Sequence, residues 1–224
     1  MEPAQTRLAQ PIPMRRRRTS QVPVLRNRKK RCRRQTSMNY PFVAISDEQT
    51  PVAADATFQH VVMTYVSETN KTASMWRAVP ETLLEFRPHA KTNSIRTILE
   101  HQLLSERRFF ADFVGLAEPS ADAVLPKGQC PTVDAYVSRY VELARGRLPQ
   151  LAQATRTWWL EEREFFGQRR ERIWTFWRRV LHTCHHRTQV QAWLRLADQH
   201  VPPIYGPSGD VSWEGATPTY KTPT

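Results

Sequence analysis

The chain has 224 residues, 33 lysines and arginines, 21 acidic residues and a net charge of +12. Residues 1–37 carry 12 of the basic residues and one of the acidic ones, so residues 38–224 have a net charge of +1. This length suits one domain with appendages, and any electrostatic attraction to nucleic acid belongs to the N-terminal residues alone. With seven glycines, the sequence contains neither a dinucleotide-binding fingerprint nor a P-loop lysine motif.

The cysteines and the apolar runs exclude further classes of protein. Cys32, Cys130 and Cys184 lie far apart and are odd in number, which argues against a disulfide framework and favours a reducing cytoplasm. No apolar segment follows the N-terminal arginines, as a secretory signal requires. No apolar run approaches the roughly 18 residues of a membrane helix, so we expect no membrane partner.

Residues 1–37 contain the basic runs MRRRRTS and RNRKKRCRRQTS. A segment with so much charge and so few apolar side chains is predicted to be a disordered tail, because it cannot bury enough surface to offset its ordering entropy. It is either an arm for nucleic acid or a targeting signal, or an extension upstream of a true start at Met38. We favour the extension.

After Met38 the apolar residues recur at three- and four-residue spacings, which predicts helices. The four expected helices run from about Thr57 to Ala78, from about Asn93 to Val114, from after Pro131 toward Trp159, and from about Gln168 to Gln199. No alternating strand pattern of useful length occurs. The sequence therefore predicts an all-α, antiparallel four-helix bundle over residues 38–203.

The ends of these helices carry their own signals. Gly115 is a candidate C-cap and Thr132 a candidate N-cap, while Gly146 and Pro149 are expected to kink or split the third helix. The turn-rich residues 204–224 are expected to be irregular. Within them Tyr205, Asp210 and Trp213 either fold back over a cavity mouth or belong to a loose tail.

The fourth helix carries the residues with the clearest chemistry. His182 and His186 are four residues apart, so they lie on one helix face and can converge on one metal ion. The glutamate of a metalloprotease HExxH motif is absent. His101, flanked by apolar residues in the second helix, is the best third ligand. His185 is second choice to His186, and hydrogen-bonded core histidines are the alternative interpretation.

This pattern resembles the DinB/YfiT-like superfamily of bacterial metal-binding four-helix bundles. The resemblance is carried by HTCHHRTQ (residues 182–189), by His101 and by Asn70, and spans about Ala54 to Pro203. One departure is Thr188, where the family usually has glycine. The resemblance implies a divalent metal held by His101, His182 and His186 with an open coordination position. It also implies thiol S-transferase or isomerase chemistry with a low-molecular-weight thiol in some members.

Other side chains are candidates for supporting roles. Possible outer-shell groups are Glu68, Asn70, Glu106 and Gln189, although a surface role is the default for both glutamates. Possible anion-binding groups are Arg178, Arg179 and Arg187. Trp193, Trp76 and Tyr65 are available to line a pocket. Cys184 is expected to pack on an apolar seam with Trp177, Val180 and Leu181 rather than to act as a ligand.

Two functions follow from these observations. The first is a metal-dependent enzyme with zinc, nickel or manganese, a small-molecule substrate and either thiol S-transferase or hydrolase chemistry, since an open site acidifies a bound thiol or water. The second is a non-catalytic helical binding protein whose basic tail contacts nucleic acid weakly. Either protein could form a homodimer.

Overall fold

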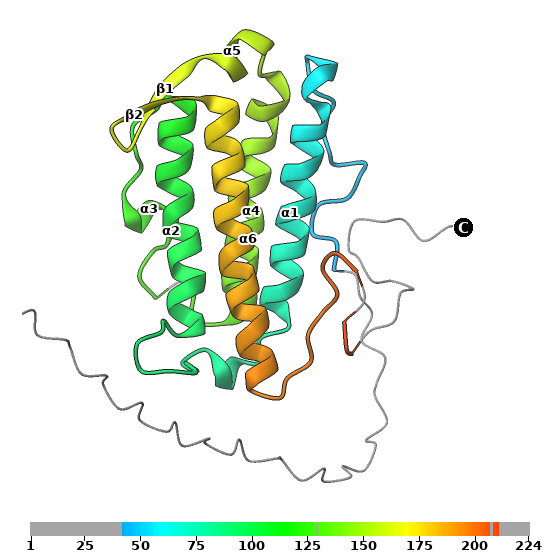
Figure 1. The fold of residues 1–224 in the computed structure, drawn as a ribbon, viewed down its shortest axis with the longest axis vertical. Coiled ribbons are helices and arrows are strands. Elements are labelled where there is room, and N and C mark those ends of the chain that lie inside the picture. The colour runs from blue at the N-terminus through cyan, green and yellow to red at the C-terminus, as the bar shows by residue number, and fades with distance from the viewer. Residues whose placement is uncertain (1–41, 129, 207, 211–224) are drawn as a thin grey trace, which may run out of the picture. The chain divides into compact units, whose positions relative to one another are not determined.

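The computed structural model describes residues 42–128, 130–206 and 208–210, so the predicted tail, residues 1–37, lies outside the described residues. The fold is a helical bundle, which confirms the predicted fold class (Figure 1). Its four long helices are α1 (Gln59–Arg77), α2 (Ile95–Val114), α4 (Val133–Gln153) and α6 (Arg172–Leu196). Short helical segments also occur: η1 (Ala56–Phe58), η2 (Glu81–Leu83), α3 (Ala121–Val124) and α5 (Arg156–Leu160).

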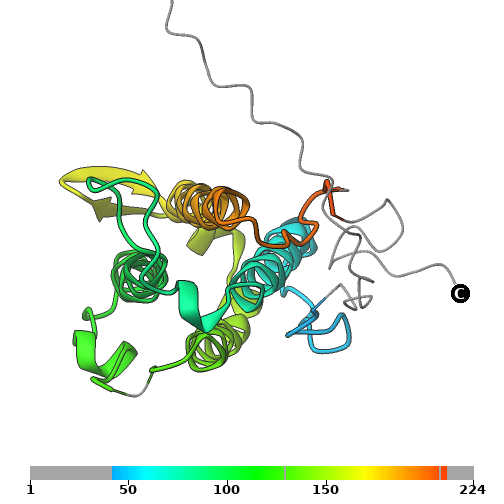
Figure 2. The same ribbon diagram turned by 90° about the horizontal axis from the view of Figure 1, so that it is seen from below.

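The four long helices stand at the corners of a square when seen along the bundle (Figure 2). α2 runs opposite to α6 and α4 runs opposite to α1 (Figure 1). α1 and α6 run in the same direction, so His60 faces Trp177 and, further along both helices, Glu68 faces Arg187. This arrangement arises because residues 115–132 return the chain to the other end of the bundle before α4 begins.

The helix ends follow the signals in the sequence. The side chain of Ser94 accepts a hydrogen bond from the backbone N–H of Thr97 at the start of α2, and Thr132 does the same for Ala135 at the start of α4. Gly115 ends α2 with φ of 82°, a left-handed conformation that a residue with a Cβ adopts only at a cost. The predicted caps at Thr132 and Gly115 are confirmed.

The third and fourth predicted helices need correction. α4 continues through Gly146 and Pro149 without being split there. The helical conformation is interrupted only at residues 154–155, before the short α5. Pro149 has no N–H to donate to the carbonyl of Arg145, four residues earlier, yet α4 extends four residues beyond it. α6 begins at Arg172 and ends at Leu196, inside the predicted bounds of residues 168–199.

A β-hairpin precedes α6, although the sequence predicted no strand. Strand β1 (Glu162–Phe165) pairs antiparallel with β2 (Gln168–Glu171), with Phe165 opposite Gln168. The two-residue turn consists of Phe166 and Gly167, whose φ angles of 52° and 73° are both positive. Positive φ at both central residues is the pattern of a type I′ turn, which matches the twist of the two strands.

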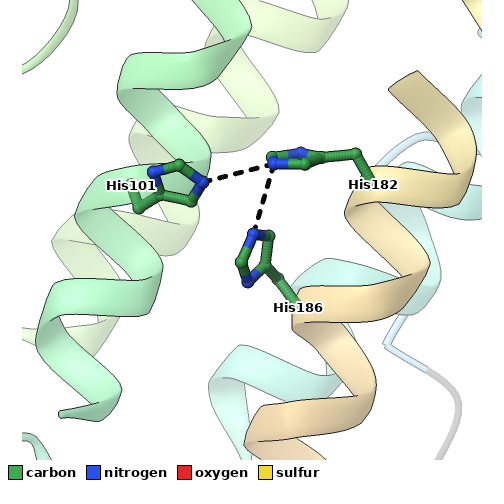
Figure 3. Close-up of side chains that lie close together, drawn as sticks. All are labelled: His101, His182 and His186. Atoms are coloured by element: carbon green, nitrogen blue, oxygen red, sulfur yellow. Dashed lines mark hydrogen bonds between the residues drawn. The ribbon is translucent and has the colours of Figure 1, made fainter. Parts of the chain in front are cut away.

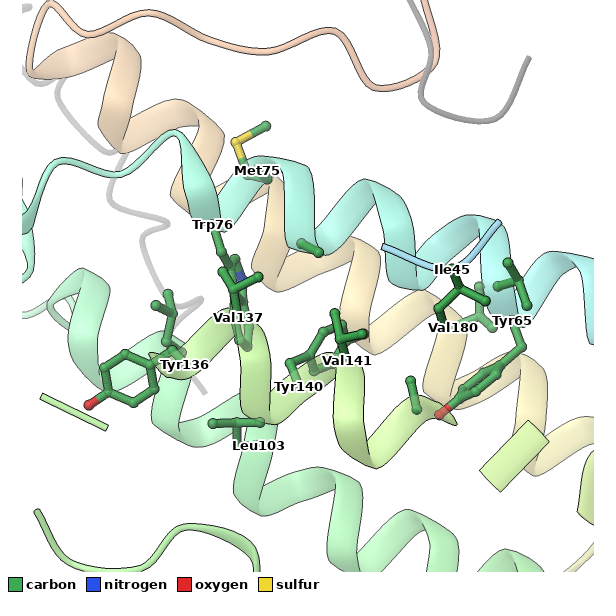
Figure 4. Close-up of a cluster of buried hydrophobic side chains, with 14 of the residues drawn as sticks. Ile45, Tyr65, Met75, Trp76, Leu103, Tyr136, Val137, Tyr140, Val141 and Val180 are labelled. Atoms are coloured by element: carbon green, nitrogen blue, oxygen red, sulfur yellow. The ribbon is translucent and has the colours of Figure 1, made fainter. Parts of the chain in front are cut away.

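The core is built from apolar side chains of all four long helices (Figure 4). Trp76 of α1 and Tyr140 of α4 are buried with their ring centroids 4.8 Å apart. Val180 of α6 and Leu103 of α2 belong to the same buried cluster. Among the described residues, no helix combines the length and the apolar character that crossing a bilayer requires.

Candidate metal centre

The three predicted ligands converge between α2 and α6 (Figure 3). His101 projects from α2, while His182 and His186 project from successive turns of α6. Nε2 of His182 lies 3.2 Å from Nε2 of His101 and 3.2 Å from Nε2 of His186. All the potential ligand atoms of this group lie within 4.8 Å of one another. The structure thus brings together one imidazole from α2 and two from α6.

These distances suit a cation with tetrahedral coordination. Metal–nitrogen bonds of about 2.0–2.1 Å at tetrahedral angles place two ligand nitrogens about 3.3–3.4 Å apart, close to the separations around His182. Three imidazoles from two helices leave a fourth position for a small molecule, which is the pattern of catalytic rather than structural sites. His101 is exposed, so that position is accessible from solvent. The residues present therefore fit a divalent metal ion.

The surroundings keep two of the imidazoles neutral. Burial, with smaller contributions from His186 and His101, lowers the pKa of His182 to about 3. Burial also lowers the pKa of His186, and this effect outweighs its hydrogen bond to Gln189, which favours the protonated ring. Neutral imidazoles carry the lone pairs that a cation needs. These two rings are therefore ready to act as ligands at neutral pH.

Gln189 fixes which nitrogen of His186 faces the group. Its Oε1 accepts a hydrogen bond from Nδ1 of His186 at 2.7 Å. A neutral imidazole has one N–H, so with Nδ1 as the donor the Nε2 atom keeps its lone pair and points it toward His182. Of the four candidate outer-shell residues, Gln189 is the one whose hydrogen bond reaches a ligand histidine.

Glu68 belongs to another cluster, between α1 and α6. Its Oε2 accepts hydrogen bonds from Arg187 and from the hydroxyl of Tyr205, each at 2.8 Å, and its Oε1 accepts one from Lys71 at 2.9 Å. Burial opposes the ionisation of Glu68, but Arg187 and Lys71 outweigh it and lower its pKa to about 2. The default expectation of a surface glutamate is wrong here, because Glu68 is buried and ion-paired.

Glu106 and Asn70 also lie in other clusters. Glu106 is buried and forms ion pairs with Arg179 of α6 and Arg147 of α4, so its expected surface role is also wrong. Asn70 accepts hydrogen bonds from the backbone N–H groups of Ala44 and Ile45 through its Oδ1. It also donates one to the carbonyl of Ile45 through its Nδ2. It therefore holds the segment before η1 against α1.

The three candidate anion-binding arginines differ in how deeply they are buried. Arg179 and Arg187 are buried in the ion pairs with Glu106 and Glu68, so carboxylates of the bundle already bind their guanidinium groups. Arg178 is exposed, one turn before His182. Arg178 is thus the one of the three that presents its side chain to solvent.

The expected pocket-lining rings lie elsewhere. Tyr65, Trp76 and Trp193 are buried in the core, so they offer no exposed ring to a substrate. The ring beside the histidines is that of Phe109, whose centroid lies 5.4 Å from that of His182. The spacing could have revealed it, since Phe109 follows His101 by two helical turns on α2.

The remaining residues of the HTCHHRTQ motif in α6 lie outside the group of three histidines. His185 is exposed and lies outside the converging group. Thr188, at the usual glycine position, is exposed too. The expected apolar seam of Cys184 is buried only in part: Val180 is buried and Cys184 packs against the core, whereas Trp177 and Leu181 are 37% and 65% exposed. The thiol of Cys184 instead lies 3.3 Å from Oε2 of Glu68.

The fold and this site together define a helical-bundle protein with a three-histidine candidate metal centre. The chain belongs to the DinB family, whose model matches residues 52–214. The resemblance recognised in the sequence is thereby confirmed. The comparison with curated protein sequences gave no match.

Two solved structures are similar to this chain. A DinB-like protein from Bacillus cereus has a TM-score of 0.55 and 17% identity, covering 65% of this chain and 95% of that one. The DinB-like protein YjoA from Bacillus subtilis has a TM-score of 0.51 and 17% identity, covering 65% and 97%. At this identity, the likeness supports the fold alone.

Proposed function

We propose that this protein is a metal-dependent enzyme that carries out thiol S-transfer or hydrolysis at His101, His182 and His186. The observation that carries the proposal is the convergence of the three Nε2 atoms on one point with an accessible side. Imidazole nitrogens suit zinc and nickel better than manganese, which prefers oxygen ligands. A divalent cation supplies Lewis acidity, which favours the ionised form of a thiol or of water.

The chain's own residues would do the rest of the work. α2 and α6 hold the three rings on rigid elements, and Gln189 holds the Nδ1 proton of His186 so that Nε2 faces inward. The ring of Phe109 packs on His182 and excludes water from that side. Exposed Arg178 is positioned to bind an anionic group of a substrate or of a low-molecular-weight thiol. The cytoplasmic location and the homodimer stay predictions.

Metal analysis of the purified protein tests this proposal. We expect about one equivalent of zinc or nickel in the wild type, and loss of that metal in His182→Ala, because removing one of three ligands leaves a weak site. Metal-loaded protein is then assayed with a panel of thiols against a chromogenic electrophile, and separately with ester and amide substrates without thiol. Metal-dependent turnover in the first assay supports the transferase, and turnover in the second alone supports the hydrolase. Wild-type protein that binds no divalent metal overturns the proposal in favour of a non-catalytic binding protein.

A further inference from the structure

The candidate metal centre depends on the placement of two helices relative to each other. His101 comes from α2, whereas His182 and His186 come from α6. The two histidines of α6 keep their spacing through the helix itself, because residues four apart lie on one face. The 3.2 Å between Nε2 of His101 and Nε2 of His182 has no such local cause. Contacts between α2 and α6 must therefore fix it.

A buried ion pair joins these two helices about one turn from the histidines. Glu106 follows His101 by five residues on α2, and Arg179 precedes His182 by three residues on α6. Because the helices run in opposite directions, both steps lead toward the same end of the bundle, over about 7.5 Å and 4.5 Å of helix (Figure 1). The side chains of Glu106 and Arg179 are each 3% exposed. The ion pair therefore ties together, inside the bundle, the two helices that carry the ligands.

A third helix holds both partners of this ion pair. Oε1 of Glu106 accepts a hydrogen bond from Nη2 of Arg179, and Oε2 accepts one from Nη1 of Arg147 on α4. The guanidinium carbon of Arg147 lies 3.7 Å from the ring centroid of Phe110. Nη2 of Arg179 lies 3.4 Å from the hydroxyl oxygen of Tyr140, also on α4. Contacts with α4 thus limit the movement of the glutamate and of its arginine.

Burial makes the ion pair favour one arrangement of the helices. Apolar residues in place of a buried ion pair often leave stability unchanged, but separating the two charges is strongly unfavourable. Within the part of the chain that the structure describes, Nε and Nη1 of Arg179 have no hydrogen-bond partner. An Arg179 displaced from Glu106 would therefore lose the contact that compensates its charge. Apolar contacts between α2 and α6 are non-directional and oppose a small shift less strongly.

We propose that Glu106 and Arg179 are positioning residues, which hold α2 and α6 so that His101 meets His182 before any ion binds. Ligand groups have to lie within about 0.5 Å of their productive places, so a helix shift of ~1 Å is enough to spoil the site. The consequence for metal affinity rests on the proposed function. The placement of the rings is a property of the metal-free chain.

Two matched variants test this role, Glu106→Gln and Glu68→Gln. Each removes the charge of a buried glutamate that is ion-paired with an arginine of α6. Glu106 lies on α2 with His101, whereas Glu68 lies on α1, which carries none of the three ligands. Both variants should lose stability, but only Glu106→Gln should disturb the histidines. A role in stability alone would give the same result in both.

Nuclear magnetic resonance of the chelator-treated full chain measures where the rings lie without an ion. The ring centroids of His101 and His182 are 5.2 Å apart, and those of His182 and His186 are 4.6 Å apart. Nuclear Overhauser effects should connect both pairs of rings in the wild type and in Glu68→Gln. In Glu106→Gln the effect between His101 and His182 should fall severalfold, because it decreases steeply with distance, while that within α6 remains. An unchanged effect between His101 and His182 overturns the inference.

A double variant covers the case in which Glu106→Gln fails to fold. Glu106→Leu combined with Arg179→Met replaces the ion pair by apolar side chains and should restore stability. The effect between His101 and His182 should stay weak in it, because the directional contact is gone. Wild-type stability together with wild-type ring contacts in the double variant contradicts a positioning role.

Metal titration separates this inference from the proposed function. Calorimetry with zinc should show affinity lowered roughly tenfold in Glu106→Gln and unchanged in Glu68→Gln. The visible absorption of bound cobalt, which depends on coordination geometry, should change in Glu106→Gln alone. If the wild type binds no divalent metal but its ring contacts respond as expected, the function falls and the positioning role stands. If all three proteins bind zinc equally well, the positioning role falls and the function stands.

Discussion

The Oε1 atom of Gln189 accepts a hydrogen bond from Nδ1 of His186 at 2.7 Å, on the side of the ring away from His182. This single contact decides the tautomer of His186, because the amide oxygen cannot donate. Gln189 is not itself a candidate ligand, but through this contact it controls whether one ligand nitrogen is available.

Gln189→Leu should weaken metal binding by roughly 10- to 100-fold, since losing the partner of a ligand histidine has effects of that size. The change removes the acceptor while keeping a side chain of similar volume. Titration calorimetry with zinc measures the dissociation constant. Gln191→Leu, two residues further along α6, is the control, and equal weakening in both variants would argue against a specific orienting role.

Two histidines of α6, His182 and His185, should behave differently on substitution. His182→Ala should abolish metal retention because Nε2 of His182 is central to the converging group, whereas exposed His185→Ala should retain the metal of the wild type. Elemental analysis after dialysis measures the metal content of both variants. Loss of metal in His185→Ala alone would move the site to the other face of the helix.

Glu68 should make the stability of the fold depend on pH. Its pKa is lowered from 4.5 to about 2 in the folded chain, so its ionised form stabilises the fold above pH 4.5. That stabilisation is of order 3 kcal/mol and is lost as the pH falls from 4.5 toward 2. Denaturant unfolding across this range measures it. The free energy of unfolding should change much less with pH in Glu68→Gln than in the wild type. An unchanged pH dependence would show that other carboxylates dominate.

Glu106→Gln should lower the free energy of unfolding by about 3–5 kcal/mol, because it leaves the buried guanidinium of Arg179 without its counter-charge. Glu142→Gln is the matched control. Its ion pair with Arg139 lies at the surface, with the Glu142 side chain 69% exposed, and should contribute about 0–1 kcal/mol. Urea unfolding compares the two variants, and similar losses would contradict the burial argument.

The sequence predicted what depends on local periodicity and spacing. The four long helices, the caps at Thr132 and Gly115, and the convergence of His182 with His186 all follow from residues close together in the chain. His101 is predicted as the third ligand from its position among apolar neighbours and from the family resemblance. Its partner lies 81 residues away, so only the packing of α2 on α6 could bring them together.

The hairpin and the buried charges could not be predicted in the same way. Strands β1 and β2 are almost entirely charged, and only Phe165 among their residues is buried, so no apolar alternation marks them. Glu68 and Arg187 look like solvated helix charges in the sequence. They are buried because each faces the other across the α1–α6 contact, 119 residues apart in the chain.

Because the three histidines come from two different helices, a bound ion would also affect the stability of the fold. A cation held by all three would crosslink α2 to α6 and close a chain loop of 81 residues. By the chain-entropy estimate for a covalent tie over such a loop, this constraint disfavours the unfolded chain by roughly 4–5 kcal/mol. The ion would then act as a staple for the bundle, and a chelator would loosen the contact between α2 and α6 before it affected α1 and α4.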